Sequence, residues 1–170
     1  MPLLKNGKVE EDAWTFAEDG VTPSDGGPVI VSFARFLAEH DVLLASNHPI
    51  GVRLANSDDP GQLAPWLDRL SLVELSFPKY TDGRAFSQAQ LLRRRYGYKG
   101  EIRATGQILR DQLRLMIRSG FDAIQFDAAD AEVVYEISSR EFSEFYQPAA
   151  DASVSIFEKR HGKTSSKAAQ

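Results

Sequence analysis

The chain has 170 residues, of which 42% are hydrophobic and 26% charged, and a net charge of −4. This is the composition of one globular domain with a sizeable core, and it excludes an intrinsically disordered chain. The absence of cysteine excludes disulfides, thiolate nucleophiles and iron–sulfur ligation.

Neither a membrane segment nor a metal site is predicted. The N-terminal residues lack the layout of a signal peptide, and no apolar run approaches the roughly 20 residues of a membrane span. The three histidines are far apart in the sequence and lack the spacing that places two ligands on one helical face. We therefore expect a cytoplasmic protein that binds no membrane and no metal.

The first 50 residues predict a hairpin, a loop and a helix. Asn6-Gly7 tolerates the positive φ angles of a type I′ turn and separates two short segments with apolar residues. Residues 18–28 are rich in Gly, Asp, Ser and Pro, which is typical of a loop. Ser32 is placed to cap a helix that begins at Phe33 and ends before His48-Pro49.

From Ile50 onward, short apolar runs alternate with segments of helical periodicity. The pattern predicts strands at 50–55, 72–77, 102–104 and 123–126, and helices at 60–70, 87–96, 108–119 and 131–145. Thr105 is placed to cap the third of these helices, and Gly97 and Gly120 lie where the second and the third should end. Such alternation indicates repeated βαβ units with a mainly parallel sheet, and thus an α/β fold. Whether the sheet is open or a partial barrel does not follow from the sequence. We expect residues 1–158 to form one domain and residues 159–170 a disordered tail.

Positive charge is concentrated in the segment from Pro78 to Arg118. It contains ten basic residues and three acidic ones, a net charge of +7, which leaves −11 for the rest of the chain. A local positive field on an acidic protein indicates an anionic small molecule or an acidic partner surface more than nucleic acid. The alternative is that these arginines form an ordinary solvated helix face.

In a parallel sheet, the loops that follow the strands meet at one edge, where helix N-termini favour anions. Four loops are therefore candidates for a site: Asn56–Asp59, Lys79–Arg84, Thr105–Gln107 and Asp127.

The second of these loops carries the strongest anion-binding candidates. Asp82-Gly83 predicts a turn that directs Lys79 and Arg84 toward the start of a helix capped by Ser87. A lysine ammonium and an arginine fork suit a carboxylate, sulfite or phosphate. The alternative is an Asp82–Arg84 ion pair that only holds the loop in place. Three further candidate binding residues follow the helix: Arg103, Thr105 and Gly106.

Arg93, Arg94 and Arg95 are consecutive on a predicted helix and span about 300° of its circumference at 100° per residue. They cannot all face one ligand, and at least one must turn toward the sheet or a partner. Arg93 is retained as a candidate for anion or partner binding. Arg103 shares a strand face with Glu101, so it either pairs with a neighbouring carboxylate or contacts a ligand.

No catalytic residue can be assigned from the sequence. Asp82 and Asp111 are the acid–base candidates, although Asp111 is already explained by its favourable position near the start of a helix. The sequence contains no phosphate-binding loop, no dinucleotide-binding turn and no nucleophile elbow of the α/β-hydrolase type.

Residues 77–111, FPKYTDGRAFSQAQLLRRRYGYKGEIRATGQILRD, resemble the bacterial family called domain of unknown function 934. Members of this family carry a run of similar residues followed by a Gly-Phe-Asp strand, which this chain has at Gly120-Phe121-Asp122. Ala85 departs from the glycine usual in the family. The resemblance extends over about residues 28–145.

The resemblance implies a role in assimilatory sulfite reduction, for which the family is often described as a probable oxidoreductase. A chain without cysteine or a dinucleotide-binding turn cannot hold most redox cofactors alone, so no cofactor is predicted and only flavin is left open. We therefore expect an accessory protein that presents a basic edge to sulfite reductase, its electron donor or sulfite.

Two other functions stay open at this point. One is a small α/β enzyme, an oxidoreductase included, that acts on an anionic metabolite with Lys79 and Arg84 as the anion clamp. Its acid–base group would be Asp82 or Asp111, and its ligand an anion such as sulfite or phosphate. The other is a structural subunit of an oligomer.

Overall fold

The computed structural model describes residues 3–20, 27–46, 48–126, 129–151 and 153–161. In this part of the chain one sheet has the strand order β2-β1-β8-β7-β6-β5-β4-β3. Its strands are β1 (Leu3–Lys5), β2 (Lys8–Glu10), β3 (Thr15–Phe16), β4 (Val29–Ser32), β5 (Ile50–Leu54), β6 (Leu72–Phe77), β7 (Glu101–Gly106) and β8 (Ala123–Gln125).

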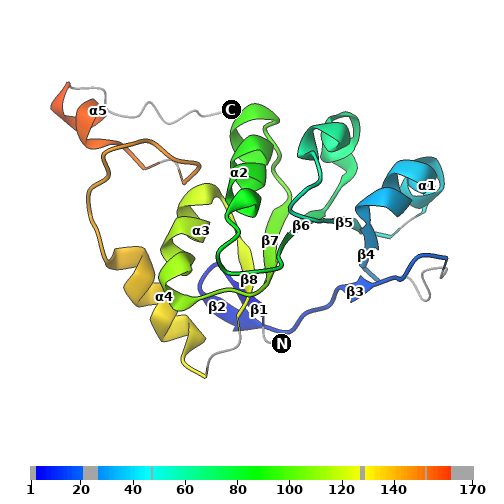
Figure 1. Ribbon diagram of the computed structural model, residues 1–170, viewed down its shortest axis with the longest axis horizontal. Coiled ribbons are helices and arrows are strands. Elements are labelled where there is room, and N and C mark those ends of the chain that lie inside the picture. Colours follow the sequence, from blue (N-terminus) through cyan, green and yellow to red (C-terminus); the bar gives the residue numbers. More distant parts are fainter. Residues whose placement is uncertain (1–2, 21–26, 47, 127–128, 152, 162–170) are drawn as a thin grey trace.

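The helical segments before β8 connect successive strands, and the last two follow it. They are α1 (Phe33–Ala45), the 3-10 helix η1 (Pro60–Arg69), α2 (Arg84–Gln90) with its π-helical continuation η2 (Leu91–Arg95), the 3-10 turn η3 (Arg110–Gln112), α3 (Leu113–Ser119), α4 (Ala131–Arg140) and α5 (Ile156–Arg160). Figure 1 shows α1, α2 and α3 along one face of the sheet.

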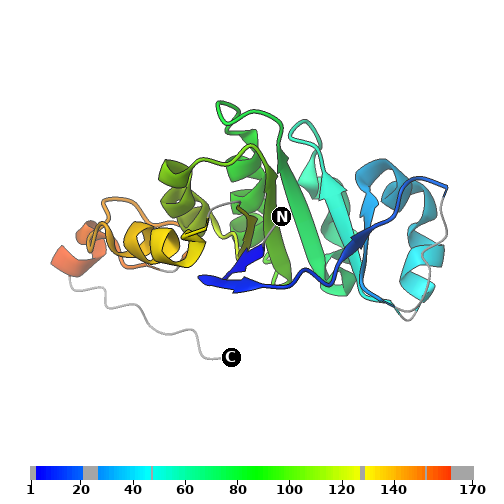
Figure 2. The same cartoon turned by 90° about the horizontal axis from the view of Figure 1, so that it is seen from below.

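Strands β3 to β8 are parallel to one another and follow one another in the sheet in the order of the chain. Because right-handed crossovers between sequential neighbours all fall on the same side, the connecting helices cover one face. The sheet curls away from them into an open half-barrel (Figure 2). The predicted α/β fold with a mainly parallel sheet is confirmed, and the sheet is an open partial barrel.

The predicted N-terminal hairpin is confirmed as β1 and β2. Asn6 and Gly7 have φ angles of 49° and 85°, and β1 pairs antiparallel with both β2 and β8. The chain then crosses to the opposite edge of the sheet, where β3 pairs with β4. Figure 2 shows this crossing segment on the sheet face that carries no helix. Residues 11–14 are called the strap below.

The core lies between the sheet and its helices. Alternate strand residues such as Val73, Leu75, Phe77 and Ile102 are fully buried on that side. Each such side chain contributes about 1.5–3 kcal/mol of hydrophobic stabilisation. The residues between them face the strap, and several of these are charged.

Two predicted helix caps are wrong. Helix α2 begins at Arg84 with Gly83 before it, and no side chain caps it, so Ser87 lies inside the helix. In the first turn of this helix, Phe86 packs edge-on against Phe77 with ring centroids 5.1 Å apart. Thr105 is a buried residue of β7 rather than a helix cap.

Other boundaries agree more closely with the sequence. Ser32 caps α1 through its hydroxyl and the Arg35 N–H, at 3.2 Å. Gly97 and Gly120 have φ angles of 67° and 98°, as a helix end requires. The helix predicted for 60–70 is a 3-10 helix with Pro65 inside it.

The C-terminal part differs from the prediction in two places. The helix expected to reach residue 145 ends at Arg140. Lys159 and Arg160, predicted to be disordered, belong to α5, which starts with a capping box between Ser155 and Glu158. Residues 162–170 lie outside the described residues.

Candidate functional site

Loops that follow neighbouring strands contact one another at one edge of the sheet, as predicted. Asn56 after β5 donates its amide to Asp82 after β6, at 2.6 Å. The Gln107 N–H donates to the Phe77 carbonyl at 2.8 Å and joins the loops after β6 and β7. Asp127, the candidate after β8, lies outside the described residues.

Arg84 binds Asp82 rather than standing free. Its Nε and Nη2 donate to the two carboxylate oxygens at 3.0 and 2.7 Å, so the planar fork is occupied. The hydrogen bond from Arg84 is the main reason that the pKa of Asp82 falls from its ordinary 3.8 to about 2. An ionised, cation-bound carboxylate is poorly suited to accept a proton at neutral pH.

This ion pair gives a first testable prediction. Replacing Arg84 by alanine should raise the pKa of Asp82 from about 2 toward 3.8, because the largest cause of its depression is removed. Carbon-13 NMR of the carboxyl group would measure the shift. Because the folded pKa is below the ordinary value, the stabilisation of the loop is present above pH 3.8 and disappears as the pH falls through about 2. An unchanged pKa in the variant would contradict the assigned pair.

The other residues of this edge do not form one site with Arg84. Lys79 is exposed and, in the part of the chain described, makes no ion pair. Asp111 is exposed in η3. Gly106 has a φ of 103°, and a Cβ there would lie 2.3 Å from the Phe77 carbonyl oxygen. Gly106 is therefore explained by the close approach of two backbones.

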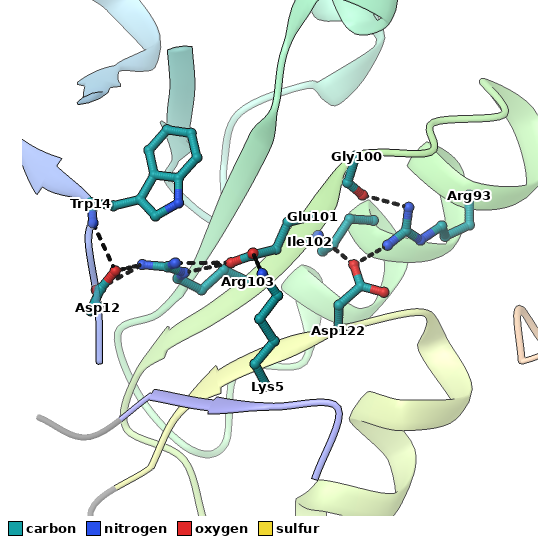
Figure 3. A network of polar contacts seen from close by, with 9 residues as sticks. All are labelled: Lys5, Asp12, Trp14, Arg93, Gly100, Glu101, Ile102, Arg103 and Asp122. Carbon is teal, nitrogen blue, oxygen red and sulfur yellow. Dashed lines mark hydrogen bonds and ion pairs between the residues drawn. The ribbon is translucent and has the colours of Figure 1, made fainter. Parts of the chain in front are cut away.

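Arg93 is an internal residue. Its guanidinium donates to the carbonyls of Gly120, Tyr98 and Gly100 at 2.8–3.0 Å and pairs with Asp122. The Asp122 carboxylate also accepts from the Ile102 N–H at 2.8 Å (Figure 3). Arg93 therefore joins the end of the π-helical turn to the starts of β7 and β8 and is not available to an anion.

Arg103 is buried at the centre of a second network, on the strap side of the sheet. Its side chain is 1% exposed, and it pairs with Asp12 at 2.8 Å and with Glu101 at 2.9 Å. Lys5 from β1 pairs with the other oxygen of Glu101 at 2.9 Å. Figure 3 shows these four side chains in one chain of contacts.

The Arg103 network fixes the strap on the sheet. Asp12 belongs to the strap, and its Oδ1 accepts both from Arg103 and from the Trp14 N–H, at 2.9 and 3.1 Å. A buried arginine is retained in a protein only where carboxylates satisfy it. Of the two sequence-based alternatives for Arg103, the structure shows the ion pair with neighbouring carboxylates.

The arginines of α3 are also engaged within the chain. Arg114 donates to the carbonyls of Ser138 and Phe142 at 2.8 and 2.9 Å. Arg118 lies 3.9 Å from the ring centroid of Phe145 and pairs with Asp151 at 3.3 Å. These contacts hold α4 and the segment after it against α3. Arg114 and Arg118 therefore do not form a solvated helix face.

Half of the ten cations of the positive segment are thus neutralised by ion pairs, those of Arg84, Arg93, Arg103, Arg110 and Arg118. Within the described residues, the cations of the segment that make no ion pair are Lys79, Arg94, Arg95, Lys99 and Arg114, and the last of these donates to backbone carbonyls.

Two of these cations lie together in η2, the continuation of α2. Arg94 and Arg95 are exposed and line a shallow hollow of about 510 Å³. Its other lining residues are Ser87, Gln90 and Leu91, and these five residues are called the Arg94–Arg95 surface below. Ser87, predicted as a binding residue, belongs to this surface.

Sequence reasoning missed a charged pair between β5 and β6. Arg53, Glu74 and Arg103 are aligned in register across three strands, and Arg53 pairs with Glu74. Glu74 is 1% exposed, and its Oε2 has no hydrogen-bond partner in the described structure. Thr105 approaches its other oxygen at 3.4 Å. The sequence signal that could have indicated this pair is a single charged residue, Arg53 or Glu74, inside each of two apolar strands.

The described residues contain neither a metal-binding cluster nor a helix that could span a membrane. They contain no group of three or more acidic or histidine side chains able to hold a metal ion. No helix among them combines the length and apolar character needed to cross a bilayer.

Comparison with known proteins gives one result that agrees with the sequence resemblance. Residues 51–157 match the family model described as "Bacterial protein of unknown function (DUF934)". The chain belongs to this family. The match includes the strands from β6 to β8, all but the first residue of β5, the Arg94–Arg95 surface and the contacts of Arg93. Of the Arg103 network it includes Arg103 and Glu101, whereas Lys5 and Asp12 precede it. A search of curated proteins found no match.

Proposed function

We propose that this DUF934 protein is an accessory protein of assimilatory sulfite reduction. In this proposal its Arg94–Arg95 surface docks on an acidic surface of sulfite reductase. The observation that carries the proposal is the presence of two adjacent, exposed arginines without an ion pair in the described structure.

The local geometry supports a docking role for these arginines. The π-helical turn η2 widens the helix by one residue per turn, and such turns are frequent at functional sites. It allows Arg93 to point inward while Arg94 and Arg95 stay in solvent. Arginine is enriched in interfaces, and Leu91 in the same hollow adds apolar surface.

The pathway in this proposal comes from the family resemblance, and the choice of an acidic partner comes from charge. Unpaired arginines attract an acidic surface to one place on this protein. The net charge of −4 of the whole chain repels the same surface elsewhere. Because the chain has no cysteine for iron–sulfur ligation, a supporting role fits better than electron transfer by this chain itself.

The test is binding to purified sulfite reductase from the same genome. Arg94→Glu/Arg95→Glu should weaken binding about tenfold or more, since exposed interface arginines are frequent hot spots. Arg110→Glu/Arg140→Glu is the matched control, because both arginines are exposed on other elements and the net charge changes equally. Biolayer interferometry would measure both affinities.

The outcomes separate the proposed partner from its alternatives. Equal weakening by both double variants would contradict docking through the Arg94–Arg95 surface. Binding of the electron donor of the reductase in place of the reductase, in the same assay, would contradict the partner named here.

A further inference from the structure

A second hollow, of about 400 Å³, lies where the starts of β7 and β8 meet the N-terminal hairpin and the strap. Its volume falls in the range of about 300–1,000 Å³ that is usual for small-molecule sites. Its lining includes Lys5, Trp14, Lys99, Glu101 and Asp122. The Arg94–Arg95 surface shares no residue with it.

The two carboxylates of this hollow already have cationic partners. Glu101 binds Lys5 and Arg103, both at 2.9 Å, and Asp122 binds Arg93. Lys99 also lines the hollow and, among the described residues, makes no ion pair. The cations Lys5, Arg93 and Arg103 are each matched by a carboxylate, Glu101, Asp122 or Asp12, and Glu10 also acts on Lys5. Lys99 is thus the charge of the lining that is left without an opposite partner among the described residues, and this ammonium favours an anion.

Lys5 carries its charge at neutral pH, at the wall of this hollow. The hydrogen bond with Glu101 raises the pKa of Lys5 above its ordinary 10.5, which keeps the ammonium protonated. The Lys5 side chain is still 37% exposed, so the ammonium can bind a second acceptor. The site thus presents one free ammonium and one that is shared with Glu101.

Trp14 provides an aromatic wall. Its backbone N–H is held by Asp12 at 3.1 Å, and Asp12 is in turn held by the buried Arg103. A Cβ at Gly51 would lie 3.1 Å from the Trp14 ring, so the indole packs against the sheet at that end. The indole N–H has no hydrogen-bond partner among the described residues. An indole in this position can stack with a planar ring and donate to an acceptor.

We propose that this hollow binds a small planar organic anion, a ring that carries an acidic group. The ring lies against Trp14, and the acidic group contacts Lys5 and Lys99. This proposal does not depend on the docking function or on catalysis. It is therefore tested by measuring the binding of a small anion to the protein directly.

The probes are benzoate and benzamide, which have the same ring but differ in charge, and inorganic phosphate, which has the charge without the ring. The chain contains two tryptophans, so its nitrogen-15 NMR spectrum has two indole N–H signals. A Trp66→Phe variant assigns them. Benzoate should shift the Trp14 signal saturably and leave Trp66, which packs against His40, unchanged. Benzamide and phosphate should each bind several-fold more weakly.

A matched pair of lysine variants locates the site. Lys99→Gln should weaken benzoate binding about two- to fivefold, the range expected for one exposed ion pair. Lys79→Gln, which removes another unpaired exposed lysine, should leave it unchanged. The dispersion of the same spectra shows that each variant is folded. Equal shifts with benzoate and benzamide, equal binding of phosphate, no Trp14 shift, or equal effects of both lysine variants would overturn the proposal.

Discussion

Replacement of Arg103 by alanine is expected to lower the free energy of unfolding by about 3–5 kcal/mol, the usual cost of breaking a buried ion pair by removing one partner. The side chain is 1% exposed, and its loss leaves Asp12 without its cation and Glu101 with Lys5 alone. Chemical denaturation measured by circular dichroism would give the value. The strap should also loosen, which amide exchange at Trp14 would show.

The control for Arg103 is another arginine of the same segment. Arg110 pairs with Asp130 at 3.2 Å, with 62% and 53% of the two side chains exposed. Arg110→Ala should cost about 0–1 kcal/mol, because exposed ion pairs contribute little. A loss below about 1 kcal/mol for Arg103→Ala as well would mean that its network does not hold the strap.

Replacement of Arg93 by alanine is the second large effect, with an expected loss of about 3 kcal/mol. The change removes the donor for the carbonyls of Gly120, Tyr98 and Gly100 and the cation of Asp122. The value lies at the lower end for a buried pair because 36% of the Asp122 side chain is exposed. Urea denaturation would measure it.

The adjacent residue provides the control for Arg93. Arg94 is exposed and makes no ion pair in the described part of the chain, so Arg94→Ala should change the free energy of unfolding by at most about 0.5 kcal/mol. If neighbouring arginines gave equal losses, the division between internal and external arginines would be wrong.

The sequence predicted the fold well because local signals and packing agree. Each strand from β5 to β8 is a short apolar run, and each connection has a length that suits a crossover. Asn6 and Gly7 adopt the positive φ angles that their turn type needs. The curvature of the sheet could not be predicted from the sequence, because it depends on helices packing on only one of the two sheet faces.

The candidate site was predicted less well because ion-pair partners are distant in the sequence. Arg103 and Asp12 are 91 positions apart, and no local window contains both. The +7 segment looked like one anion-binding surface because four of its six carboxylate partners lie outside it, at Asp12, Asp122, Asp130 and Asp151.

The helical periodicity of the sequence also could not show that Arg93, rather than one of its neighbours, points inward. The three consecutive arginines predicted that at least one would turn inward, but the π-helical turn that selects Arg93 comes from tertiary packing. Ser87 was misread for a related reason, since α2 begins at Arg84 and its first turn packs on Phe77 of β6, a contact that no local sequence window contains in full.

The salt dependence of binding to sulfite reductase tests the proposed docking most directly. Docking through Arg94 and Arg95 predicts that the affinity of the wild-type protein falls as salt rises, because mobile ions screen exposed charges. An Arg94→Ala/Arg95→Ala variant should bind more weakly and lose most of this dependence. Equal affinities with the same slope in both proteins would contradict the proposal.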